Sequence, residues 1–158
     1  MIWLLYIAVI GGSSCSAAEK KIAFEVGSEI ARNGAVLVCG GGSGVMEAAA
    51  EGATSAGGTA IGVLPGEWTR EGNRYLSFAI ATGLGEARNA IITRTADAVI
   101  AVGGEYGTLS EIALALKMGK PTIGINSWTL QPPHQLKSGL IHAGSPVEAV
   151  EKALSLSV

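Results

Sequence analysis

Cysteine and histidine are scarce in this 158-residue sequence. The two cysteines, Cys15 and Cys39, are too few for a disulfide framework, and their separation fits neither a zinc site nor a CxxC redox motif. The two histidines, His134 and His142, have no neighbouring metal ligands and belong to no readable Ser-His-Asp arrangement. We therefore expect a protein of the reducing cytoplasm without a metal centre, and we interpret both cysteines as small buried apolar residues.

Charged residues are also few, at 15% of the chain. Eleven Lys and Arg against 13 Asp and Glu give a net charge of -2, with no basic block that could neutralise the phosphates of a nucleic acid. Hydrophobic residues make up 48% of the chain, which excludes a disordered protein. The length is that of one domain, so the sequence predicts a single domain over residues 1–158 that does not bind nucleic acid.

The apolar opening of the chain, MIWLLYIAVIGGSSC, has two interpretations: a secretory or lipoprotein signal, or a buried first strand. No Lys or Arg precedes the apolar residues, and the stretch is too short to span a membrane. We therefore predict a strand over residues 7–10 and no membrane association.

Several short apolar runs alternate with helical patterns along the chain. Runs without polar alternation, each separated from the next by a helix, indicate a parallel sheet covered on both faces. The sequence thus predicts an α/β, Rossmann-like, doubly wound fold. The segment 126–144 has no clear period and is expected to be a long loop. The predicted strands span residues 7–10, 35–39, 59–64, 76–81, 98–102 and 121–125.

Glycine is the abundant residue, with 23 copies, and three glycine clusters each follow a predicted strand and precede a predicted helix. Parallel strands end at the same edge of a sheet, where helix N-termini present unpaired N–H groups and glycine lets ligand oxygens approach the main chain. The clusters therefore predict a binding site for a phosphate-bearing ligand, although GxGxxG and GxxxxGK[ST] motifs are lacking. The predicted binding residues in them are Gly11, Gly12, Ser13, Gly40, Gly41, Gly42, Ser43, Gly44, Gly103, Gly104, Gly107 and Thr108.

Thr108 and Glu111 have the spacing of a helix capping box, a device that the chain also shows at Ser16 with Glu19 and at Ser145. A cap is therefore one interpretation of this pair. The other follows from the preceding glycine pair, which would place the carboxylate of Glu111 at an anion site, where it suits a cation developing on a substrate.

Arg88 is expected at the start of a helix, where a cation opposes the helix dipole unless an anion binds nearby. We therefore predict a functional role for Arg88, with the neighbouring Asn89 able to donate and to accept hydrogen bonds. Arg94 and Asp97, near the end of the same helix, are expected to form a surface ion pair.

Two stretches of the sequence resemble the Lonely Guy (LOG) family, whose members often carry the label "possible lysine decarboxylase". These are GGGSGVMEAAAEGATSAGGTAIGVLPG and ADAVIAVGGEYGTLSEIALALKMGKP, with the RN pair at Arg88 between them. The resemblance covers most of the chain and is strongest to the short branch, which includes molybdenum-cofactor carrier-like proteins. The family signature is PGGxGTxxE with an upstream Arg-Lys pair. Here Val102 replaces the proline, one residue is added before Gly107, and Asn89 replaces the lysine.

The resemblance implies one site with two uses. In a carrier, the glycine-rich edge would hold a phosphorylated nucleotide or the phosphate of a pterin such as the molybdenum cofactor. In a hydrolase of cytokinin riboside 5'-monophosphates, which needs no cofactor, Arg88 would orient the nucleotide and Glu111 would stabilise an oxocarbenium-like ribose or direct water. A nucleotide sensor is a third class. Decarboxylase chemistry is disfavoured, because neither Lys117 nor Lys120 is placed to bind pyridoxal. The resemblance and the high apolar fraction also imply a homo-oligomer, a dimer or a tetramer.

Overall fold

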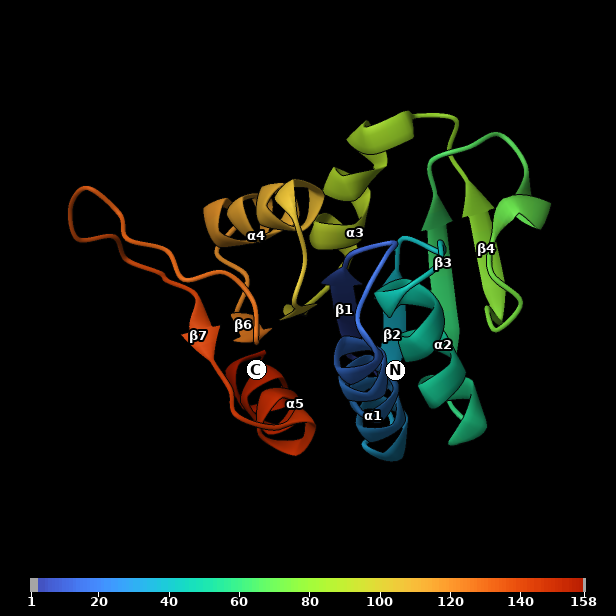
Figure 1. Ribbon diagram of the computed structural model, residues 1–158, viewed down its shortest axis with the longest axis horizontal. Coiled ribbons are helices and arrows are strands. Elements are labelled where there is room, and N and C mark those ends of the chain that lie inside the picture. The colour runs from blue at the N-terminus through green and yellow to red at the C-terminus, as the bar shows by residue number, and fades with distance from the viewer. Residues whose placement is uncertain (1–2, 158) are drawn as a thin grey trace.

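Within residues 3–157, seven parallel strands form one sheet in the order β4-β3-β2-β1-β5-β6-β7 (Figure 1). The computed structural model describes residues 3–157. The predicted Rossmann-like α/β fold is confirmed. The strands are β1 (Tyr6–Gly11), β2 (Val36–Cys39), β3 (Ala60–Leu64), β4 (Phe78–Ala81), β5 (Ala98–Val102), β6 (Thr122–Ile125) and β7 (Ile141–His142).

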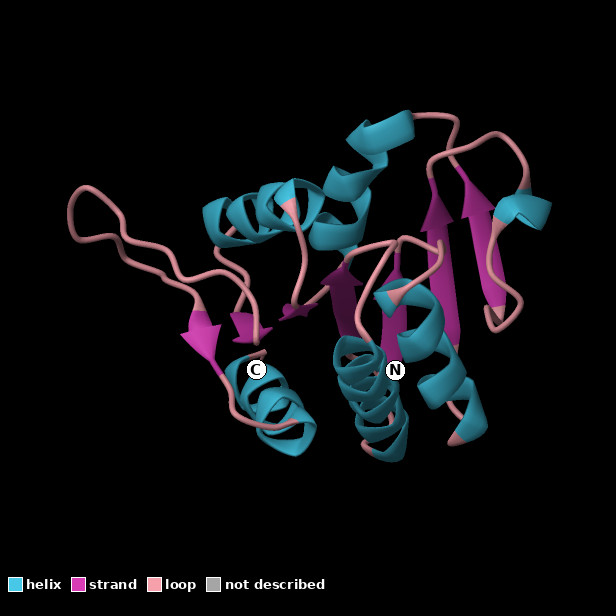
Figure 2. Ribbon diagram, in the orientation of Figure 1, coloured by secondary structure: helices cyan, strands magenta, loops and turns pink. Residues whose placement is uncertain are grey.

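Helices cover both faces of the sheet (Figure 2). Buried residues of α1, α2 and α5 pack on one face, and buried residues of α3 and α4 pack on the other. None of the helices within residues 3–157 is long and apolar enough to cross a membrane. The helices are α1 (Ala17–Arg32), α2 (Val45–Ser55), α3 (Asn89–Thr95), α4 (Tyr106–Lys117) and α5 (Pro146–Leu156), with 3-10 turns η1 (Thr69–Glu71) and η2 (Gly85–Arg88).

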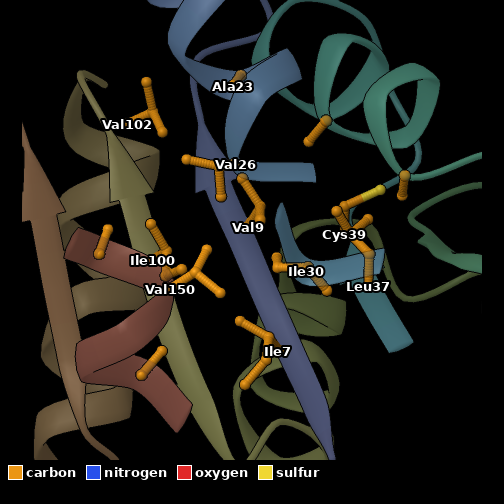
Figure 3. Packing of buried hydrophobic residues seen from close by; sticks show 14 of the residues in the cluster. Ile7, Val9, Ala23, Val26, Ile30, Leu37, Cys39, Ile100, Val102 and Val150 are labelled. Carbon is orange, nitrogen blue, oxygen red and sulfur yellow. The ribbon is translucent and has the colours of Figure 1, made fainter. Parts of the chain in front are cut away.

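The central strand β1 shows why the apolar runs lack polar alternation. Successive side chains of a strand point to opposite faces of the sheet. Ile7 and Val9 belong to the core cluster that contains residues of α1, and Val26 lies beside Val9 (Figure 3), while Ala8 joins the core under α3 and α4. The apolar residues near the start of the chain are thus the middle of the sheet.

Two helices begin after the serines that the sequence marks, but only the first has the complete capping box. At α1, Ser16 Oγ accepts a hydrogen bond from Glu19 N at 3.1 Å, and Glu19 Oε2 accepts one from Ser16 N at 2.7 Å. At α5, Ser145 Oγ accepts from Glu148 N at 3.2 Å, but the Glu148 carboxylate accepts from Gly144 N, one residue earlier than in a capping box.

Two expectations from the sequence are wrong. The segment 126–144 is not loop throughout, because Ile141 pairs with Ile123 and adds the short edge strand β7. Arg94 and Asp97 form no ion pair; instead Asp97 Oδ2 accepts a hydrogen bond from Tyr6 N at 2.8 Å. That bond gives the first amide of β1 a partner, which is a stronger requirement than a surface ion pair.

The order in which strands are added to the sheet changes direction between β1 and β5. Strands β2, β3 and β4 extend the sheet on one side of β1, and β5, β6 and β7 extend it on the other. The connections after β1 and β5 therefore diverge at the carboxyl edge of the sheet. Such a switch point is where ligands bind in open parallel sheets, and the first and third glycine clusters flank it.

Candidate functional site

A pocket of about 310 Å³ lies at this switch point. Residues from the β1–α1 turn form one side of it, and the first turns of α3 and α4 form the other. The structure thus brings together eight of the predicted site residues, namely Gly11, Gly12, Ser13, Arg88, Asn89, Gly107, Thr108 and Glu111. Ser14, Met46, Glu86 and Glu105 also line the pocket, and none of these four was among the predicted site residues.

The second glycine cluster, residues 40–44, does not line the pocket. Its backbone is used inside the protein: Val45 N donates to Gly12 O at 3.0 Å, and Ser43 Oγ donates to Ser13 O at 2.9 Å. Gly41 O accepts from Asn73 N at 2.8 Å. This cluster therefore holds the β1–α1 turn in place, and contact between its residues and a ligand stays a prediction.

Helix α4 begins earlier than the capping-box interpretation requires. Its N-cap is Glu105, which makes no side-chain capping bond, and Thr108 lies inside the first turn. Thr108 and Glu111 are therefore three residues apart within a helix, which puts both side chains on one face. The capping interpretation of this pair is wrong, and both residues line the pocket.

Thr108 and Glu111 are buried polar groups without protein partners. Their exposed fractions are 4% and 8%, and none of the side-chain hydrogen bonds within residues 3–157 involves either of them. No completely buried side-chain nitrogen or oxygen in that range lacks a partner, so their oxygens open onto the pocket. Polar oxygens that have no protein partner and open onto one pocket are free to hydrogen-bond a polar ligand there.

Burial strongly shifts the proton affinity of Glu111. Removal of the carboxylate from water raises its pKa to about 7, and the charge of Arg88 opposes this rise only in part. Arg88 and Glu111 form no salt bridge, so the carboxylate keeps a proton to unusually high pH. A perturbed carboxyl group in a cleft is typical of functional sites.

The guanidinium of Arg88 ties together three segments at the carboxyl edge. Its Nε donates to Val63 O at 2.8 Å, its Nη2 to Gly40 O at 3.0 Å, and its Nη1 to Asn89 Oδ1 at 2.7 Å. Arginine has five N–H donors, so these three bonds leave two for a ligand. Arg88 thus connects β3 with the residue that follows β2 through hydrogen bonds, and it also lines the pocket. Asn89 orients the guanidinium.

Replacement of Arg88 by lysine is expected to lower the free energy of unfolding by about 2–3 kcal/mol. A single ammonium cannot reach both carbonyl oxygens and Asn89, so buried acceptors lose their partner. Urea denaturation measures the change. Arg94→Lys, at an exposed position of α3, is the matched control and should change stability by less than ~0.5 kcal/mol. Equal changes in the free energy of unfolding for the two variants would contradict a stabilising role of the Arg88 hydrogen bonds.

The pocket wall carries three carboxylates, Glu86, Glu105 and Glu111, against one guanidinium, that of Arg88. An anion would therefore depend on main-chain donors. The first N–H groups of α4, from Tyr106 to Thr108, have no intrahelical partners, and the helix dipole makes that end electropositive. Within residues 3–157, no three His, Cys, Asp or Glu side chains are grouped closely enough to hold a metal ion.

The other predicted residues lie outside this pocket. Gly103 and Gly104 line a second hollow beside it. Cys39 is buried at the end of β2, and this burial raises its thiol pKa to about 11, which makes it an unreactive packing residue as predicted. Cys15, also free, is only partly buried, so the interpretation of both cysteines as buried residues is wrong for Cys15.

Comparison with known families agrees with this geometry. The model of the SLOG cluster4 family matches residues 4–152, which include every strand and the whole pocket wall. The chain belongs to the SLOG cluster4 family. Among solved structures, this SLOG cluster4 chain is similar to the molybdenum cofactor binding protein of Rippkaea orientalis, with 36% identity, a TM-score of 0.89 and all of both chains covered. It is also similar to the molybdenum cofactor carrier protein of Chlamydomonas reinhardtii, with 34% identity, a TM-score of 0.83 and 98% of each chain covered.

Two relatives by sequence extend the comparison. A protein of Archaeoglobus fulgidus described as uncharacterized is 44% identical to the SLOG cluster4 chain over 155 residues, 98% of each. A rice protein, described as a probable cytokinin riboside 5'-monophosphate phosphoribohydrolase, is 34% identical over 113 residues, which are 67% of this chain and 49% of the rice protein. The resemblance to the LOG family and its molybdenum-cofactor carrier-like branch is thereby confirmed.

Proposed function

We propose that the protein is a carrier that binds a phosphorylated pterin of the molybdenum-cofactor class, or a phosphorylated nucleotide, in the pocket between β1 and α4. The observation that carries this proposal is the pair of buried, unpartnered polar groups, Thr108 and Glu111, beside the free amides of α4. Two similar proteins over nearly the whole chain, described as binding or carrying the molybdenum cofactor, support the choice of ligand.

The phosphate would lie at the first turn of α4. There the N–H groups of Gly107 and Thr108 and the Thr108 hydroxyl can donate to its oxygens. The two remaining N–H groups of Arg88 reach the same pocket from the α3 side. These donors bind the ligand without breaking a bond in it, which is what a carrier requires.

One observation favours the alternative function, N-glycosidic hydrolysis of nucleoside monophosphates. Glu111 has a pKa of about 7 and sits in a pocket with an arginine, so it could accept a proton from water near neutral pH or stabilise a positive ribose. The similarity to the rice protein points the same way over part of the chain.

Bound pterin in the purified protein tests the first proposal. We expect protein from cells that make the molybdenum cofactor to release a pterin on denaturation, measured by fluorescence after oxidation. Thr108→Val keeps the buried shape but removes a hydroxyl donor, so it should carry roughly tenfold less pterin. Thr95→Val, at an exposed position of α3, is the control and should carry a normal load.

The same protein separates carrier from hydrolase. It is incubated with AMP and with cytokinin riboside 5'-monophosphate, and free base and ribose 5-phosphate are measured. No turnover, together with bound pterin, is the result expected of a carrier. Turnover that disappears in Glu111→Gln would establish the hydrolase instead, and a protein that neither contains pterin nor binds added molybdopterin would overturn the carrier proposal.

The predicted homo-oligomer and the cytoplasmic location stay predictions, as does the single domain. The apolar side chains of Phe78 and Ile80 on β4 and of Leu84 beyond it are more than half exposed. Exposed apolar residues on a sheet edge support association between copies of the chain.

A further inference from the structure

A second hollow, of about 400 Å³, adjoins the first pocket on the other side of the β5–α4 turn. Its wall comes from the start of α1, the end of β5 and the loop after β6, three segments that meet at the carboxyl edge of the sheet. The size is sufficient for a bicyclic heterocycle. The lining residues are Glu19, Gly103, Gly104, Asn126, Ser127, Trp128 and Thr129.

The carboxylate of Glu19 offers this hollow a free acceptor. Glu19 Oε2 accepts the capping bond from Ser16 N at 2.7 Å, which fixes the side chain. The other oxygen, Oε1, lies against Gly103, where a Cβ atom would collide with it. Glu19 has no ion pair among the described residues, so Oε1 remains available to a ligand.

Trp128 adds an aromatic side chain to the wall of this hollow, and its contacts hold it in place. Trp128 Nε1 donates to Glu105 O at 3.2 Å, and the indole packs against Tyr106 with ring centroids 5.9 Å apart. Ser127 Oγ donates to Gly103 O at 2.6 Å and fastens the loop to the β5–α4 turn. Asn126, which precedes them, has φ of 46° and contributes an amide to the lining.

We propose that this second hollow binds the 2-amino-4-oxopyrimidine ring of a pterin or a guanine base, with Glu19 accepting from its N–H groups and Trp128 covering its face. That ring presents an amino group and a ring N–H side by side, so a donor of the ring can reach the free oxygen Oε1 while Oε2 keeps the capping bond. Adenine presents an unprotonated ring nitrogen at the corresponding edge, which a carboxylate repels. The proposal rests on the proposed function, because it assigns the heterocycle of the ligand whose phosphate lies in the first pocket.

Binding of GMP, AMP and 6-methylpterin, measured by titration calorimetry, tests the assignment. We expect GMP to bind at least tenfold more tightly than AMP, the effect of one charge-assisted hydrogen bond or more. Glu19→Gln should remove this preference and weaken 6-methylpterin binding by a similar factor. Glutamine still completes the capping box through its carbonyl oxygen, but it turns an N–H donor toward the ligand, so the variant should fold normally.

Glu151→Gln, on the exposed surface of α5, removes the same charge far from the hollow and should bind all three probes like the wild type. Equal binding of GMP and AMP, a preference that survives in Glu19→Gln, or no binding of GMP and 6-methylpterin would each overturn the inference. Ribose 5-phosphate, which has no heterocycle, tests the phosphate site by itself. Its failure to bind, alongside Glu19-dependent binding of 6-methylpterin, would remove the proposed phosphate site and leave the second hollow standing.

Discussion

Replacement of Gly104 by alanine is expected to lower the free energy of unfolding by about 2–6 kcal/mol and to abolish ligand binding. The backbone at Gly104 has φ of 100°, which costs an L-residue about 1–3 kcal/mol. An added Cβ would also collide with the side chain of Thr108, and such overpacking costs a further 1–3 kcal/mol or so. The collision can be relieved only by displacing Thr108, which is a wall of the pocket.

The matched control is Gly107→Ala, three residues further along. Gly107 is inside α4, and an added Cβ there would meet no atom within 4 Å. Alanine should therefore keep or raise stability, by up to about 1 kcal/mol from helix propensity. The new methyl group lies in the wall of the pocket, so pterin load should still fall. Urea denaturation and pterin release compare the two variants, and equal stability would contradict the close contact between Gly104 and Thr108.

The fold was predictable because its signals are local. Apolar runs marked six of the seven strands that the structure describes in residues 3–157, and the serines at 16 and 145 marked two helix starts. The seventh strand, β7, has only two residues, and its pairing of Ile141 with Ile123 depends on the sheet already being formed. The sequence of the segment 126–144 alone cannot indicate this pairing, because Ile123 lies outside the segment.

The sequence predicted where the candidate site lies, but not which of the predicted residues line the pocket and which support the backbone around it. Three glycine clusters at one edge followed from parallel strands. Which cluster lines the pocket depends on long-range hydrogen bonds, such as those from Val45 N to Gly12 O and from Asn73 N to Gly41 O. In the same way, Thr108 and Glu111 have capping-box spacing, and only the actual start of α4 at Tyr106 shows that they form no cap.

For Glu19, in contrast, the sequence predicted the local role but not the position of the residue in the lining of the second hollow. Its capping role was correctly predicted from the spacing to Ser16, and the cap uses one carboxylate oxygen. The contact of the second oxygen with Gly103 joins residues 84 positions apart in sequence. A residue with a complete local explanation can therefore still contribute to a site that only the tertiary structure assembles.

Glu111 is expected to make the folded protein less stable as pH rises from about 4.5 to above 7. The folded-state pKa of about 7 exceeds the ordinary value of 4.5, so over this interval the folded chain keeps a proton that the unfolded chain has released. The stabilisation is complete below pH 4.5 and is lost as pH rises through 7. At about 1.4 kcal/mol for each pKa unit, the loss amounts to about 3 kcal/mol.

Glu111→Gln isolates this contribution, because glutamine has a similar shape and does not titrate. Urea denaturation of both proteins from pH 4 to pH 8 gives the difference in unfolding free energy at each pH, and groups common to both proteins cancel. We expect this difference to move by about 3 kcal/mol in favour of the variant as pH rises. A flat profile for Glu111→Gln would show that the carboxylate is well solvated. The variant could instead gain stability relative to the wild type as pH rises and also lose its bound pterin. The buried charge of Glu111 would then destabilise the fold at neutral pH but be required for ligand binding, a trade-off found at functional sites.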